Sequence, residues 1–304
     1  MRKLLIAAAG ILAIGFAAFW IITAPASVPA SALPPRTPDL ENGKVMFYAG
    51  GCASCHASTG QRDATRLGGG LALESRFGTF YAPNISPDRD DGIGRWNEAD
   101  FITALWKGTS PQGQHYYPAF PYTSYQRIAL DDARDLFAYL RTLPAVAGKA
   151  PPHQVPFPLN WRRLLGGWKF LFLDGQPFRP DPSKSAQWNR GAYLVNGPGH
   201  CAECHSPRNL LGGIEAGMRF AGGPDIEGKG WVANITQKGL ADYSEKDIAY
   251  LLETGQTPDG DSVGGAMTAV IRNASQLPAA DREAMAVYLK SLAPVDGPPR
   301  PQKK

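Results

Sequence analysis

Cys52-Ala-Ser-Cys55-His56 and Cys201-Ala-Glu-Cys204-His205 hold all four cysteines of this 304-residue chain. The spacing Cys-x-x-Cys-His is the pattern of covalent haem attachment. Two thiols one helical turn apart add across the two vinyl groups of one porphyrin, and the adjacent histidine supplies the proximal imidazole. The sequence therefore predicts two covalently bound haem c groups, with His56 and His205 as iron ligands.

Other chemistry also uses paired cysteines, and the context of these pairs argues against it. Two Cys-x-x-Cys pairs can form a zinc site, but these pairs lie about 150 residues apart and each is followed at once by histidine. A thioredoxin-like redox pair requires a βαβ setting, which the pattern does not contain. Structural disulfides would not require a histidine after each pair. Haem attachment explains both motifs together.

The bulk composition limits the class of protein. With 304 residues, 43% of them hydrophobic, the chain is long enough for two modest domains. The net charge of +4 is weak and the basic residues are spread along the chain, so we expect no nucleic-acid partner. The 34 glycines and 27 prolines show no period, which excludes a collagen-like repeat and favours small helical domains with long loops.

The N-terminus predicts export. Arg2 and Lys3 precede an uncharged apolar run over residues 4–22, and its 19 residues come close to spanning a hydrocarbon core of about 30 Å. Because a signal-peptide core usually has only about 7–15 apolar residues, we expect an uncleaved transmembrane helix with its N-terminus in the cytoplasm. The alternative is a long signal peptide cleaved near Ala30–Ala32. Under both interpretations the rest of the chain lies outside the cytoplasm.

The second half of the chain repeats the first. Gly50-Gly51-Cys52 matches Gly199-His200-Cys201, Asn84-Ile85-Ser86 matches Asn234-Ile235-Thr236, and residues 108–113 match 255–260. We therefore predict an all-α fold with two tandem haem-binding domains, at 38–147 and 186–294. A signal anchor and tether (1–37) precede them, a Pro-rich linker (148–185) joins them, and a tail (295–304) follows.

Apolar periodicity places three helices in each half. In the first half these are 40–52, 98–107 and 131–143; in the second they are 188–201, 245–253 and 279–292. Tyr139 and Tyr288, near the ends of the last helices, are interpreted as core residues packed on the first helices. One further short helix is expected at 162–172, within the linker.

The second axial ligand of each iron is predicted separately. Met267 stands in the loop Gly264-Gly265-Ala266-Met267, about 60 residues after the second motif, and is the expected distal ligand of haem 2. Through the repeat, Met267 corresponds to Phe120, which cannot bind iron. His115 is a weak candidate for haem 1; the other possibilities are a water, an open iron, a donor from another chain, or one of Tyr116, Tyr117, Tyr122, Tyr125 and His153.

The proximal histidines should each donate their free ring N–H to a backbone carbonyl, which fixes the orientation of the ring. Pro207, two residues after His205, offers a carbonyl at the second site. The first site has Ser58 at the matching position.

Several motifs resemble one known family. Pro83-Asn84-Ile85-Ser86-Pro87-Asp88, Gly92-Ile93-Gly94-Arg95-Trp96 and Cys204-His205-Ser206-Pro207-Arg208-Asn209 are similar to dihaem class I cytochromes c that serve bacterial periplasmic alcohol, gluconate and aldehyde-type dehydrogenases. The resemblance covers nearly all of residues 38–294. It implies two all-α cytochrome c domains that pass electrons from a dehydrogenase toward a quinone, a cytochrome or a terminal oxidase. Many relatives have methionine at the position of Phe120 or of Ile128, which this chain lacks.

Three functions are compatible with these features. The favoured one is an electron-transfer protein or subunit, not itself an enzyme, anchored on the periplasmic side of the bacterial inner membrane; a soluble periplasmic form after signal cleavage is the alternative. The second is a dihaem enzyme of peroxidase or thiosulfate-oxidising type, with catalysis at haem 1 because its methionine is missing. The third is a haem sensor for a small gas, although no signalling domain is present.

Overall fold

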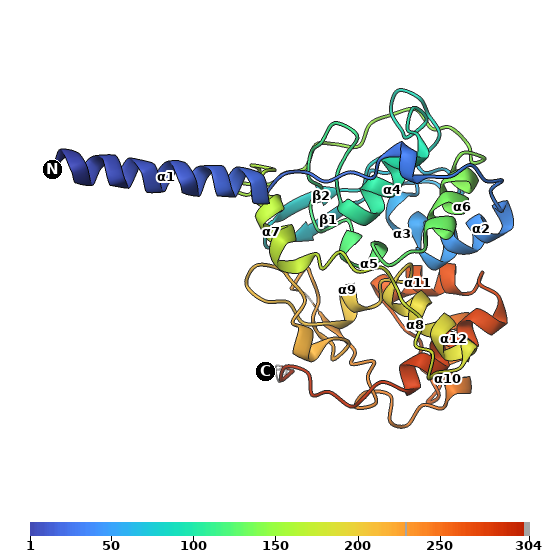
Figure 1. The fold of residues 1–304 in the computed structure, drawn as a ribbon. Helices are drawn as coiled ribbons and strands as arrows, with labels where there is room; N and C mark the ends of the chain where they lie inside the picture. Colours follow the sequence, from blue (N-terminus) through green and yellow to red (C-terminus); the bar gives the residue numbers. More distant parts are fainter. Residues whose placement is uncertain (229, 301–304) are drawn as a thin grey trace.

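The computed structural model describes residues 1–228 and 230–300, and it is predominantly helical (Figure 1). The end of the predicted tail, 301–304, lies outside the described residues. The apolar N-terminal segment forms one long helix, α1 (Arg2–Ile22), which projects from one side of the folded body (Figure 1). The predicted helix over residues 4–22 is confirmed as a helix.

The two halves contain the same succession of helices. In the first half these are α2 (Leu40–Ala49), α3 (Cys52–His56), α4 (Glu98–Lys107), α5 (Tyr122–Tyr125) and α6 (Leu130–Leu140). In the second half they are α8 (Ala186–Asn196), α9 (Ala202–His205), α10 (Glu245–Thr254), α11 (Ala266–Ala274) and α12 (Ala279–Lys290). The remaining helical segments are η1 (Ala30–Ala32), α7 (Leu164–Phe172) and η2 (Ala216–Met218).

Matching local chemistry sets the limits of α4 and α10. Each begins with a reciprocal capping box, formed by Asn97 and Asp100 in α4 and by Ser244 and Asp247 in α10. Each ends at a glycine in the left-handed region, with φ of 54° and 78°. The residues that begin and end these helices are therefore repeated along with the rest of the sequence.

The first and last helices of each half cross closely at a glycine. A Cβ built on Gly43 of α2 would lie 2.2 Å from the carbonyl oxygen of Asp135 in α6, and one on Gly191 of α8 would lie 1.8 Å from that of Ala284 in α12. Only glycine permits this approach. Tyr139 and Tyr288 flank the two crossings, and their rings contact Phe47 and Trp188, so the predicted packing role is confirmed.

Two small hairpins correct the all-α prediction. β1 (Ala72–Ser75) pairs antiparallel with β2 (Gly78–Tyr81), and β3 (Gly223–Pro224) pairs with β4 (Trp231–Val232). The strands have two to four residues, too few for an alternating pattern to stand out in the sequence. Both hairpins lie in the long loop that follows a haem motif.

The two halves share one hydrophobic core. The same cluster of buried side chains includes Phe47, Leu136 and Phe137 of the first half and Leu194, Val195 and Leu289 of the second. The Tyr193 hydroxyl crosses between the halves, since it accepts a hydrogen bond from the Ala129 amide (3.1 Å) and donates one to the Asp132 carboxylate. The halves are therefore held against one another by side chains as well as by the chain between them.

Candidate haem sites

Each Cys-x-x-Cys-His motif forms a short helix that begins after a left-handed residue. Gly51 (φ 56°) precedes Cys52, and His200 (φ 38°) precedes Cys201. The residue before each motif is therefore left-handed in both halves, although only the first is of the type that adopts this conformation readily. The longer first helices predicted at 40–52 and 188–201 end early, at Ala49 and Asn196, and a glycine, Gly50 or Gly197, follows each of them.

Both proximal histidines are fixed by a backbone carbonyl. His56 Nδ1 donates to the Pro83 carbonyl at 2.8 Å, and His205 Nδ1 donates to the Ala233 carbonyl at 2.8 Å. The predicted type of partner is thus found, but Pro207 is the wrong residue, because its carbonyl accepts from the Glu215 amide instead. Pro83 and Ala233 precede the matching residues Asn84 and Asn234, so the repeat extends to these contacts.

The residues present fit a haem c group at both sites. With Nδ1 engaged, each histidine offers Nε2 to an iron, in the tautomer that a ligand requires. None of the four cysteines takes part in a disulfide, so each sulfur is available for a thioether bond to a porphyrin vinyl group. Across residues 1–228 and 230–300, no three His, Cys, Asp or Glu side chains gather as a zinc site would require. When bound, haem supplies an iron that alternates between ferric and ferrous states.

The two motifs meet at the boundary between the halves. The third residue of each motif bonds to a helix of the other half: Ser54 Oγ accepts from Asn273 Nδ2 of α11 (2.9 Å), and Glu203 Oε1 accepts from the hydroxyls of Thr123 and Ser124 in α5 (2.7 Å each). α5 and α11 follow matching loops, so the arrangement is reciprocal. Figure 1 shows α3, α5, α9 and α11 gathered where the halves touch.

Glu203 is a buried carboxylate at this boundary. Burial opposes its charge, but the Arg208 guanidinium (2.7 Å) and the Ser124 and Thr123 hydroxyls outweigh that effect and hold the pKa of Glu203 below its usual value. An ionised Glu203 therefore bridges the second motif and the first half. Glu203 was not among the site residues predicted from the sequence; the available signal was a charge inside one haem motif where the other motif has serine.

His200 and Tyr125 also contact one another at the boundary between the two halves. The Tyr125 hydroxyl donates to the Gly50 carbonyl (3.0 Å), His200 Nε2 lies 3.4 Å from the same oxygen, and the two rings meet edge-to-face with centroids 5.5 Å apart. Gly50 precedes the first motif and His200 precedes the second. The backbone leading into one haem site therefore contacts the side chain leading into the other.

Met267 lies in the first turn of α11 rather than in a loop, because Gly265 (φ 60°) begins the helix immediately before it. Its side chain is half-buried. Met46 and Met285 are buried in the shared core. Met218 lies in η2.

The candidate ligand His115 is placed elsewhere. It is buried, its Nε2 donates to the Thr23 carbonyl at the end of α1 (2.9 Å), and its Nδ1 accepts from the Lys169 ammonium of α7 (2.9 Å). Both ring nitrogens are engaged, so this arrangement does not favour His115 as a ligand of haem 1. His115 joins α1 and α7 to the first half.

The other candidates for haem 1 differ in their partners. The hydroxyl groups of Tyr117 and Tyr125 donate to backbone carbonyls, and His153 Nδ1 accepts from the Tyr81 amide (3.0 Å). Tyr122 is fully buried, and within the described part of the chain its hydroxyl has no hydrogen-bond partner. Phe120, at the position that matches Met267, lies edge-on to the Tyr122 and Tyr125 rings.

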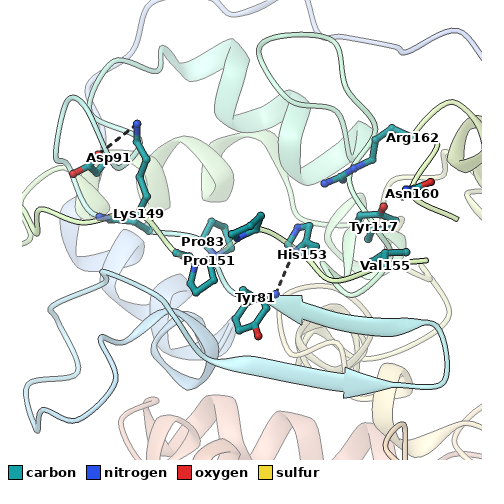
Figure 2. Close-up of a pocket in the computed structure, with 13 residues that line it drawn as sticks. Tyr81, Pro83, Asp91, Tyr117, Lys149, Pro151, His153, Val155, Asn160 and Arg162 are labelled. Atoms are coloured by element: carbon teal, nitrogen blue, oxygen red, sulfur yellow. Dashed lines mark hydrogen bonds and ion pairs between the residues drawn. The ribbon is translucent and has the colours of Figure 1, made fainter. Parts of the chain in front are cut away.

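A pocket of about 540 Å³ opens beside the proximal side of haem site 1 (Figure 2). Pro83, whose carbonyl holds His56, is part of its wall. The polar groups around it come largely from the segment after α6: His153, Asn160, Arg162, and Lys149, which is 3.7 Å from the Asp91 carboxylate. Arg162 also stacks on the Tyr117 ring, 3.9 Å from its centroid. The pocket is therefore aromatic and cationic.

These features define a c-type haem protein with two attachment sites. The cytochrome c family model matches residues 40–144. A diheme cytochrome c-type protein of Cereibacter sphaeroides is 46% identical over 298 residues, which cover 97% of this chain and all of that protein. The chain belongs to the dihaem c-type cytochromes, and it carries two covalently bound haem c groups.

Two further relatives are parts of dehydrogenases. A nicotinate dehydrogenase subunit of Pseudomonas putida is 43% identical over 256 residues, 83% of this chain but 21% of that protein. The fructose dehydrogenase cytochrome subunit of Gluconobacter japonicus is 37% identical over 269 residues, 87% of this chain and 54% of that subunit. The chain thus spans about a fifth and about half of these two relatives.

Proposed function

We propose that this protein is a membrane-anchored electron carrier of the periplasm that accepts electrons from a dehydrogenase and delivers them to a quinone, a cytochrome or an oxidase. Residues 38–147 and 186–294 each form one haem domain, joined by 148–185. Cys52, Cys55, Cys201 and Cys204 hold the porphyrins, His56 and His205 bind the irons, and Met267 is the distal ligand of haem 2. The observation that carries the proposal is the meeting of both haem motifs at one boundary.

That boundary favours transfer between the haems. Because Ser54 and Glu203 are themselves motif residues, the contacts that join the halves also set the relation of the two attachment helices. A protein that moves electrons contributes haem orientation, ligation and local electrostatics. The names of the relatives, which include cytochrome subunits of fructose and alcohol dehydrogenases, support a dehydrogenase as the donor.

Anchoring by α1 is supported by its length, its composition and the contacts of its end. Among the described residues, α1 is the one helix long and apolar enough to cross a membrane, and none of it is buried in the folded body. Thr23, just beyond it, is buried: its carbonyl accepts from His115 and its hydroxyl accepts from Arg163 (2.8 Å). Cleavage near Ala30–Ala32 would remove these partners, so the contacts favour a retained helix over a cleaved signal.

The test is reduction of the holoprotein by a candidate dehydrogenase in stopped-flow absorbance, with alcohol, sugar and aldehyde-oxidising enzymes of the source bacterium as donors. We expect both haems to become reduced while the dehydrogenase oxidises its substrate. Failure of all donors, with dithionite still reducing both haems, would contradict the role proposed for the protein. Release of the protein from membranes by high salt without detergent would contradict the anchor.

A catalytic role for haem 1 is the second candidate, favoured by Phe120 at the position of Met267. Low-temperature electron paramagnetic resonance of the oxidised protein, with a haem count by pyridine haemochrome, distinguishes an electron carrier from a dihaem enzyme. We expect two low-spin signals for a simple carrier. A high-spin signal near half of the haem content, together with turnover of peroxide or thiosulfate, would favour the dihaem enzyme.

A further inference from the structure

The helix α7 has its polarity reversed relative to a helix of a soluble protein. Its one charged residue, Lys169, is buried, while Phe170 and Leu171 are 70% and 60% exposed. A surface helix in water normally buries its apolar residues and exposes its charges. Contact with water is therefore unfavourable for the exposed face of α7.

The hydrogen bonds of Lys169 explain why this charged residue lies on the buried face of α7. The Lys169 ammonium donates to the carbonyls of Lys107 and Gly108 (2.6 and 2.5 Å), the last acceptors of α4, and to His115 Nδ1. A cation at the C-terminal end of a helix satisfies carbonyls that lack intrahelical partners. This attachment fixes the rotation of α7, so the exposure of Phe170 and Leu171 is built into the fold.

Further exposed apolar side chains lie on the segments that contact or adjoin α7. Trp168 Nε1 donates to the Leu211 carbonyl (2.9 Å), which ties α7 to the loop carrying Leu210 and Leu211, 86% and 57% exposed. On the α1 side, the Trp161 ring lies 5.8 Å from that of Phe19, and both Trp161 and Phe157 are exposed. We call this set the α7 face: Phe157, Trp161, Phe170, Leu171, Leu210 and Leu211.

The α7 face is continuous with the apolar helix α1. Arg163 stacks on Trp20, 4.2 Å from its ring, and donates to the Trp20 carbonyl, and Gly166 of α7 packs directly on Thr23. Figure 1 shows α1 leaving the body on the side where α7 lies. Tryptophan and arginine at the end of a spanning helix are typical of the interface between lipid and water.

We propose that the α7 face seats on the lipid headgroups around α1, so that the haem body rests on the bilayer in one orientation instead of swinging on a tether. This inference rests on the proposed anchoring by α1. A bilayer is favoured over a protein partner because the face begins where the candidate spanning helix ends. The reversed polarity of α7 is what a helix lying in the interface requires.

The test uses the full holoprotein in phosphatidylethanolamine and phosphatidylglycerol vesicles, with a photoreactive benzoylphenylalanine at Leu171, Ile14 or Tyr250. Ile14 lies within α1, and Tyr250 is exposed on α10 in the second half. We expect lipid adducts at Leu171 and Ile14, and several-fold fewer at Tyr250. Adducts at Ile14 without any at Leu171 overturn the inference and leave the anchor intact; none at either position overturns both.

A variant separates the face from the anchor. In Phe170→Glu with Leu171→Glu, both charges replace exposed side chains, so the fold should tolerate them. We expect lipid adducts from a probe at Leu210 to fall several-fold while those at Ile14 are unchanged. Unchanged labelling at Leu210 refutes the seating. Cross-links from Leu171 to a dehydrogenase subunit in native membranes, in place of lipid, would assign the face to a protein partner.

Discussion

Replacing Glu203 by alanine should weaken the boundary between the two haem sites. The carboxylate accepts three side-chain hydrogen bonds, from Thr123, Ser124 and Arg208, each at 2.7 Å, and only 9% of its side chain is exposed. Removing it leaves the two hydroxyls without this acceptor, and the Arg208 guanidinium keeps only the Gly212 and Glu203 carbonyls. The hydroxyls belong to the first half of the molecule and the guanidinium to the second, so the loss falls on the contact between haem sites.

The size of the effect follows from these partners. Hydrogen bonds to a charged group contribute about 1.5–3 kcal/mol each. Adding these values for the three bonds of Glu203 would overstate the loss of stability, because the contributions of neighbouring contacts are not additive. Arg208 is 21% exposed and recovers part of its hydration once Glu203 is gone. We therefore expect about 3–5 kcal/mol, the range for breaking a buried ion pair by removing one partner. Glu203→Gln, which keeps one acceptor oxygen, should cost about 1–3 kcal/mol.

Thermal unfolding of the holoprotein, followed by circular dichroism, measures this loss. At about 2–4 °C per kcal/mol for a chain of a few hundred residues, Glu203→Ala should lower Tm by on the order of 10 °C. Ser54→Ala, at the matching position in the first motif, is the control: it removes a neutral hydrogen bond from Asn273 and a long one (3.5 Å) to the Ala269 carbonyl, together worth about 1–2 kcal/mol. A Tm for Glu203→Ala no lower than that of Ser54→Ala would refute the role given to Glu203.

Three further outcomes are expected, the first of them from the proposed ligation of haem 2 by Met267. Met267→Ala should abolish the methionine-to-iron absorption band and lower the potential of haem 2, whereas Met285→Leu should leave both unchanged. Gly43→Ala should cost about 1–3 kcal/mol in chemical denaturation because its Cβ would strike the α6 backbone, whereas Gly167→Ala, with open space around it, should be neutral or stabilising. Burial lowers the pKa of His115, so stability should fall as pH drops below about 6.5, and the fall should be smaller in His115→Gln.

Stability is expected to fall at low pH because the imidazole of His115 is neutral in the folded protein. His115 accepts from Lys169 through Nδ1, so the folded protein holds it uncharged, while the unfolded chain protonates it near its ordinary pKa. Burial also lowers the pKa of Lys169, to about 7, and the sign is the same, because the unfolded state again binds more protons; this effect falls between about pH 7 and pH 10.5, above the range in which His115 acts. A stability that rises on acidification from pH 7 to 5 would contradict this assignment.

What could be predicted from the sequence is what depends on neighbours along the chain. The haem motifs, the capped helix starts at Asn97 and Ser244, and the repeat all follow from local spacing. The misassignments concern partners distant in sequence: the carbonyl that holds His205 belongs to Ala233, 28 residues away, not to Pro207. His115 was a candidate ligand because nothing in the neighbouring sequence reveals that the end of α1 and the helix α7 contact it.

The contacts at the boundary also link the first haem motif to the helix that carries Met267. Ser54, inside the first motif, bonds to Asn273 of α11, the helix whose first turn carries Met267. With Met267 as the proposed ligand of haem 2, we expect a change of charge at that iron to act on α11 and, through Asn273 and Ser54, on the first motif. Ser54→Ala should weaken this link, so the two haem potentials, separated in spectroelectrochemical titration, should interact less than in the unaltered protein. Equal interaction in both would mean that the haems affect one another through charge alone.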